Sequence, residues 1–174
     1  MKTMTRTLLP LTFAVAAASS VQAAELDVSV EIPEMTVAEY HNPYVAVWLE
    51  NKDSKEVINL AVWYDTDMRD DEGKKWLKDM RQWWRRSGRS LEMPVDGVSA
   101  ATQGPGKYDL SFTAGKAQLK DLADGEYRLR VEAAREVGGR EILNIPFSWP
   151  ADKAQTLTVQ GESELGEIAL TIKP

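Results

Sequence analysis

The chain has 174 residues, no cysteine, and 27 acidic against 21 basic side chains, so its formal net charge at pH 7 is −6. The absence of cysteine excludes disulfides, thiolate metal sites and a cysteine nucleophile. Because the phosphates of nucleic acid repel an acidic chain, we set nucleic-acid binding aside as a function class.

The first 23 residues have the order of a secretory signal peptide. Lys2 and Arg6 precede an apolar stretch, and small residues end at Ala23. This order predicts export to the periplasm and cleavage after Ala23. The apolar stretch is short for a membrane span, so we expect a protein that does not span the membrane. Residues 24–174 have about the length that one core fills, which predicts a single domain.

Eight runs of alternating or β-branched residues follow, separated by polar and glycine-containing breaks. In the clearest run, residues 126–134, apolar side chains alternate with charged ones, as is typical of a half-buried antiparallel strand. Short strands at this spacing predict a mainly β, two-sheet sandwich of immunoglobulin-like or fibronectin-like type, with a barrel as the alternative. The runs are 26–32, 43–50, 56–64, 107–112, 126–134, 141–149, 155–160 and 166–172.

One segment, residues 73–88, has helical rather than strand periodicity. Large apolar side chains recur there among charged ones, and Gly88 is a typical C-terminal stop. We therefore expect one amphipathic helix inserted between the third and fourth runs. The recurring side chains are Trp76, Met80, Trp83 and Trp84.

Two tryptophans of this segment are neighbours, Trp83 and Trp84, and they cannot both point inward from one helix. We expect one indole to lie exposed beside Arg85 and Arg86. A planar ring could stack on it while the arginines neutralise a phosphate. The alternative is a wide apolar face that covers one end of the sandwich.

The only histidine, His41, stands in an HNP tripeptide before the second run. One histidine cannot form a His-rich zinc site, but it could ligate a haem-like group or act as a base. The alternative is a turn in which the imidazole caps a backbone group. The acidic run over residues 65–72 lacks the ligand spacing of a calcium loop, so no metal is expected.

Four stretches resemble, in order, a family of predicted periplasmic proteins of unknown function, numbered 2271, across nearly the whole mature chain. That family has no established activity. The stretches are HNPYVAVWLENKDSKEVINLAVWYD, KWLKDMRQWWRRSG, DGVSAATQGPGKYDLSF and DGEYRLRVEAAREVGGRE.

Within the third stretch, DGVSAAT is similar to the flavinylation sequence Asp-x-x-(Ser/Thr)-(Gly/Ala)-Ala-Thr of exported targets of FAD:protein FMN transferases. The matching positions are Asp96, Ser99 and Thr102, and Ala100 stands where many targets have glycine. The resemblance implies that the Thr102 hydroxyl attacks the diphosphate of FAD, which releases AMP and leaves FMN held by a phosphoester. An acceptor needs an exposed loop with small neighbours, which this segment is expected to provide.

The family resemblance also implies a gene neighbourhood with such a transferase and with PepSY-type membrane reductases. We therefore expect a periplasmic flavoprotein that carries FMN on Thr102 and takes part in electron transfer, as a redox carrier rather than a stand-alone enzyme. Residues near the cofactor would be Asp96, Ser99, Trp83, Trp84, Arg85, Arg86 and His41. The alternative is a non-catalytic binding or accessory module that uses the Trp/Arg helix and His41 to bind a partner or a haem-like ligand.

Overall fold

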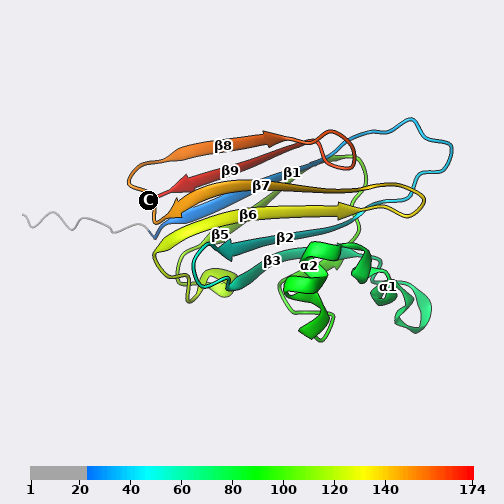
Figure 1. Ribbon diagram of the computed structural model, residues 1–174, viewed down its shortest axis with the longest axis horizontal. Helices are drawn as coiled ribbons and strands as arrows, with labels where there is room; N and C mark the ends of the chain where they lie inside the picture. The colour runs from blue at the N-terminus through cyan, green and yellow to red at the C-terminus, as the bar shows by residue number, and fades with distance from the viewer. Residues whose placement is uncertain (1–22) are drawn as a thin grey trace, which may run out of the picture.

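Two β-sheets pack face to face, and a short helical segment covers the outer face of one of them (Figure 1). The computed structural model describes residues 23–174, so the predicted signal peptide lies, apart from its last residue, outside the described residues. Within that part no helix combines the length and the apolar character needed to cross a membrane.

The strands form a four-stranded sheet of order β5-β1-β9-β8 and a five-stranded sheet of order β4-β3-β2-β6-β7. Neighbouring strands are antiparallel except for the pair β3 and β4, which is parallel. The bounds are β1 (Glu25–Ile32), β2 (Tyr44–Asn51), β3 (Val57–Tyr64), β4 (Ser99–Ala101), β5 (Gly106–Thr113), β6 (Gly125–Ala134), β7 (Arg140–Trp149), β8 (Gln155–Gln160) and β9 (Glu167–Lys173).

Eight of these strands coincide with the eight predicted runs to within one residue at each end, which confirms a mainly β, two-sheet sandwich. In β1 every second side chain is buried, because one face meets the opposite sheet. In β2 both faces are buried, because the second face lies under the helical segment. The strand that the sequence did not predict is β4, whose three residues are too few to show alternation.

The prediction of one helix over residues 73–88 is wrong. The segment is a series of short turns, with Met80 at a non-helical ψ of 73° between two of them. Leu77, Met80 and Trp83 are three residues apart and all buried. In a 3₁₀ turn the side chains of residues three apart eclipse one another, so these three side chains stay on one face although the helix is interrupted at Met80. The turns are α1 (Glu72–Lys75), α2 (Arg81–Arg86) and 3₁₀ turns at Arg69–Asp71, Leu77–Asp79 and Gly88–Ser90.

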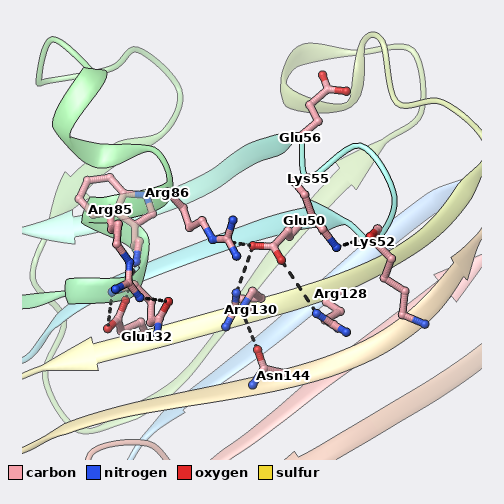
Figure 2. Close-up of polar contacts among 12 residues, drawn as sticks. Glu50, Lys52, Lys55, Glu56, Arg85, Arg86, Arg128, Arg130, Glu132 and Asn144 are labelled. Carbon is pink, nitrogen blue, oxygen red and sulfur yellow. Dashed lines mark hydrogen bonds and ion pairs between the residues drawn. The ribbon is translucent and has the colours of Figure 1, made fainter.

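A buried carboxylate on β6, that of Glu132, fixes the start of α2 (Figure 2). It accepts hydrogen bonds from the backbone N–H groups of Gln82 at 3.1 Å and Trp83 at 2.7 Å. The guanidinium of Arg140 on β7 donates to the same carboxylate at 2.8 Å. The first N–H groups of a helix have no partner inside it, and Met80 offers no side-chain cap. Glu132 supplies that cap from the sheet.

We expect Glu132→Gln to lower the free energy of unfolding by about 2 to 3 kcal/mol, because it leaves buried donors without a charged acceptor. Urea denaturation measures the change. The matched control is Glu56→Gln, on an exposed position of the β2–β3 hairpin, where a change within about 0.5 kcal/mol is expected. Equal midpoints for the two variants would contradict the assigned role of Glu132.

Candidate functional site

A hollow of about 380 Å³ lies at one end of the sandwich, where the 33–43 loop, the β6–β7 hairpin and the helical segment meet. In Figure 1 this is the end at which α1 is drawn. Segments far apart in the sequence contribute to its lining, among them His41, Trp76, Thr102 and Arg135. We call it the Thr102 hollow. Its volume lies within the range of about 300 to 1,000 Å³ that is typical of small-molecule sites.

Thr102 directly follows β4 and is half-buried at this hollow. The two residues before it, Ala100 and Ala101, are exposed and carry only methyl groups. Because β4 lies at the edge of its sheet and pairs only with β3, the approach to Thr102 along this edge is not blocked by a further strand. Thr102 therefore lies on an open sheet edge, next to small and exposed side chains.

Asp96 and Ser99, the other motif positions, lie in the turn that leads into β4. Gly97 has a φ of +68°, a conformation that favours glycine. The Ser99 hydroxyl accepts a hydrogen bond from the N–H of Val95 at 2.8 Å, while Asp96 is exposed. Neither side chain is part of the lining of the Thr102 hollow. The segment expected as a plain loop is thus a fixed turn followed by a short strand.

The His41 imidazole is half-buried in the same hollow and stands between two carboxylates. Its Nε2 lies 2.9 Å from Glu39 and its Nδ1 lies 3.8 Å from Glu136. The structure therefore brings together two predicted site residues, His41 and Thr102, which are 61 positions apart in the sequence.

Apolar side chains form much of the wall of the Thr102 hollow. Trp76, Met68 and Val137 are 48%, 39% and 71% exposed, and only one other large apolar side chain in residues 23–174 is comparably exposed. Exposed apolar groups gathered in one concave surface indicate a binding site. Tyr44 adds an aromatic ring, and burial raises the pKa of its phenol. Carboxylates of Asp65, Asp79 and Glu136 complete the wall.

Arg135 supplies a cation at the end of β6, and its side chain is only 6% exposed. It forms a two-pronged ion pair with Glu164, with Nε at 2.8 Å and Nη2 at 3.2 Å from the carboxylate oxygens. Glu164 also accepts the N–H of Gly139 at 2.7 Å. The remaining nitrogen of Arg135, Nη1, is buried without a hydrogen-bond partner among the described residues.

The loop that carries Glu164 is itself held by Glu141 on β7. The Glu141 carboxylate accepts backbone N–H groups from four successive residues, 162–165, at 2.7 to 3.1 Å. The position of Arg135 in the hollow thus depends on a chain of contacts that runs from Glu141 through the loop to Glu164.

The structure does not bring the predicted Trp83, Trp84, Arg85 and Arg86 to the Thr102 hollow. Trp83 is fully buried, and its indole N–H donates to Asn59 at 2.8 Å. Trp84 packs beside it, half-buried, at the edge of the cluster on the outer face of the five-stranded sheet.

The two arginines are engaged on the same outer face (Figure 2). Arg85 donates to Gln82 at 2.9 Å. Arg86 lies 3.5 Å from Glu50, a buried carboxylate that Arg128 and Arg130 also approach. The neighbouring indole that faces the hollow is Trp76, which sequence reasoning placed within the apolar stripe of the helix.

Sequence reasoning also missed Met68, Arg135 and Val137. They carry no local pattern, because chain topology alone brings them next to Thr102. Val137 has one unusual feature, a φ of +52°, which a β-branched residue adopts only at a cost and which is more frequent at functional sites.

The sheets and the Thr102 hollow define a two-sheet β-sandwich protein with a hollow of small-molecule size whose lining includes Thr102, His41 and Trp76. The model of the family described as "Predicted periplasmic protein (DUF2271)" matches residues 25–167, and the chain belongs to this family. Its localisation is the periplasm, as the signal sequence predicted. No curated protein and no solved structure matches the chain.

Acid is expected to loosen the loop at 162–165. Burial by itself raises the pKa of Glu141, but the hydrogen bonds from this loop outweigh it and hold the pKa below its ordinary value of 4.5. The stabilisation is therefore complete above the unfolded-state pKa and is lost as the pH falls through the lower folded-state value. We expect the urea midpoints of wild type and Glu141→Gln to differ at neutral pH and to converge in acid.

The control for this prediction is Glu162→Gln, whose side chain is exposed on the same loop. Its midpoint should follow that of the wild type at every pH. A difference between wild type and Glu141→Gln that stays constant down to about pH 3 would contradict the assigned role of the carboxylate.

Proposed function

We propose that the protein is a periplasmic flavoprotein that carries FMN covalently on Thr102 and relays electrons from a PepSY-type membrane reductase to a periplasmic acceptor. The observation that supports this most directly is the position of Thr102. The acceptor residue of a flavinylation-like sequence stands at the rim of a ligand-sized hollow with an exposed indole.

The attachment step needs FAD and a FAD:protein FMN transferase as partner. The Thr102 oxygen forms a bond to the FMN-side phosphorus, the bond between that phosphorus and the oxygen of AMP breaks, and AMP leaves. The hydroxyl proton is taken up by the transferase or solvent. This chain contributes only the nucleophile and its access, which the exposed Ala100 and Ala101 provide.

The residues of the Thr102 hollow fit a flavin. Trp76 and Tyr44 offer aromatic faces for a planar ring, and Met68 offers a polarisable side chain that packs against ring edges. His41 and Arg135 supply nitrogen donors for ring carbonyl oxygens. A bound flavin would supply the redox chemistry, while these side chains orient it and set its electrostatic surroundings.

The alternative, a non-catalytic binding module, requires His41 and the Trp/Arg segment to share one surface. His41 lines the Thr102 hollow, whereas Trp84, Arg85 and Arg86 lie on the outer face of the five-stranded sheet. This separation removes the single surface that the alternative needs, and it equally removes the Trp/Arg group from the surroundings of the proposed flavin. A haem titration distinguishes the two roles, because the alternative expects a Soret band that His41→Ala abolishes.

Intact mass spectrometry tests the attachment. When wild type is exported together with an active flavin transferase, we expect its mass to rise by that of FMN less one water. Thr102→Ala should show no increase, because the acceptor oxygen is gone, and Thr102→Ser should regain it. Thr66→Ala, an exposed threonine beside the lining residue Asp65, is the matched control and should be modified. An unmodified wild type, with the transferase active on a known target, would overturn the proposal.

Flavin fluorescence tests where the ring lies. In the modified protein an indole stacked on the flavin quenches its emission, so Trp76→Leu should increase flavin fluorescence severalfold. Trp84→Leu removes an indole that does not line the hollow and should leave the emission unchanged. A larger increase from Trp84→Leu would place the ring on the outer face of the five-stranded sheet.

A further inference from the structure

A second hollow, of about 490 Å³, lies between the start of α2 and the β6–β7 hairpin. Arginines supply much of its lining although the chain as a whole is acidic. The side chains that matter are those of Arg81, Arg135, Arg140 and Asp79, together with the backbone of Gly138 and Gly139. We call it the arginine hollow.

The three guanidinium groups have more donors than the protein uses. Each guanidinium carries five N–H donors. Arg135 gives two nitrogens to Glu164, and its third is buried without a partner among the described residues. Arg140 donates through Nη1 to Glu132. Arg81 is exposed, and no ion pair within residues 23–174 engages it.

Two glycines keep the hairpin close to Arg135 and the hollow open. A Cβ added at Gly138 would lie 2.5 Å from the guanidinium carbon of Arg135, and one at Gly139 would lie 2.8 Å from the Glu164 carboxylate. Any side chain at either position would have to displace the Arg135–Glu164 pair or fill the space beside it. Glycine at both positions therefore lets the backbone approach the Arg135–Glu164 pair without displacing it.

We propose that the arginine hollow binds a small oxyanion with more than one negative charge, a phosphate or a polycarboxylate. Guanidinium groups bind such oxygens through paired, charge-assisted hydrogen bonds. Glu132 and Glu164 already offset the charges of Arg140 and Arg135, and Asp79 stands on the wall. The Asp79 carboxylate repels any anion in this hollow. We therefore expect a multivalent anion, because it can form several charge-assisted hydrogen bonds at once and these offset the repulsion.

The arginine hollow and the Thr102 hollow share Asp79, Ala134 and Arg135. An anion bound to the arginines would therefore lie next to the proposed flavin. If the protein is an electron carrier, this position suits an anionic acceptor such as a metal chelate of a polycarboxylate. This consequence rests on the proposed function, whereas the anion site itself does not.

Isothermal titration calorimetry tests the site on unmodified protein, purified after export from a host without a flavin transferase. Inorganic phosphate and citrate are titrated separately. We expect saturable 1:1 binding of at least one of them, and citrate alone would identify the polycarboxylate as the ligand class. Because the protein carries no flavin in this experiment, a negative result leaves the proposed function standing.

Variants locate the binding. Arg81→Gln should weaken the affinity about tenfold, the equivalent of one charge-assisted hydrogen bond. Asp79→Asn should increase the affinity, because the substitution removes the carboxylate that repels the anion. If the two residues had only a structural role, the two substitutions would not change the affinity in opposite directions. Arg89→Gln changes an exposed arginine outside the hollow and should bind as the wild type does.

Three results would overturn the proposal. One is the absence of saturable binding of either anion up to about 10 mM. The second is an unchanged affinity of Arg81→Gln, and the third is an equal loss in Arg89→Gln, which would indicate diffuse charge attraction. Far-ultraviolet circular dichroism of each variant confirms that the fold is retained, which is expected for Arg81 because its side chain is exposed.

Discussion

The contact on which the helical segment depends is the buried carboxylate of Glu132 under the start of α2. A carboxylate removed from water is stabilised only where charged or polar donors surround it, and Glu132 has two backbone N–H groups and Arg140. This arrangement positions Trp83 over the outer face of β2 and β3. The residues just before α2, including Trp76 and Asp79, are thereby held near the Thr102 hollow, and Arg140 is held in the arginine hollow.

Buried and half-buried carboxylates fix the rest of this end of the molecule as well. Glu141 holds the loop at 162–165, and Glu164 in that loop holds both Arg135 and the hairpin backbone at Gly139. Many exported proteins use disulfides to join segments that are distant in sequence. This chain has no cysteine, and these carboxylate contacts join such segments instead. The acidic composition of the chain therefore has a structural use, since several of its carboxylates serve as acceptors for loops rather than as surface charge.

The strands could be predicted from the sequence because each sheet face imposes a period of two on the residues that it buries. The helical segment could not, because its three buried anchors have the spacing of 3₁₀ turns and the cap comes from Glu132, 50 positions later. Alternation also gave no sign of β4, which has only three residues.

At the candidate site, His41 and Thr102 could be identified from single residues and a local motif. The rest of the Thr102 hollow comes from side chains that only the fold brings together, so Met68, Val137 and Arg135 had no signal of their own. For a related reason, the sequence could not tell which tryptophan of the helical segment lines the Thr102 hollow. The direction of an indole in a short turn depends on how the turn packs on the sheet beneath it. Here Trp83 packs against the sheet and is buried, whereas Trp76 is exposed and lines the hollow.

The short parallel pairing of β4 with β3 has a consequence for when a modification can occur. Only three residue pairs join β4 to the sheet, Val62 with Ser99, Trp63 with Ala100 and Tyr64 with Ala101. Such a short edge strand can detach by a local opening at a small fraction of the free energy of global unfolding. If a transferase acts on Thr102 as proposed, it can therefore reach β4 by local opening of the folded protein, and modification does not require an unfolded precursor.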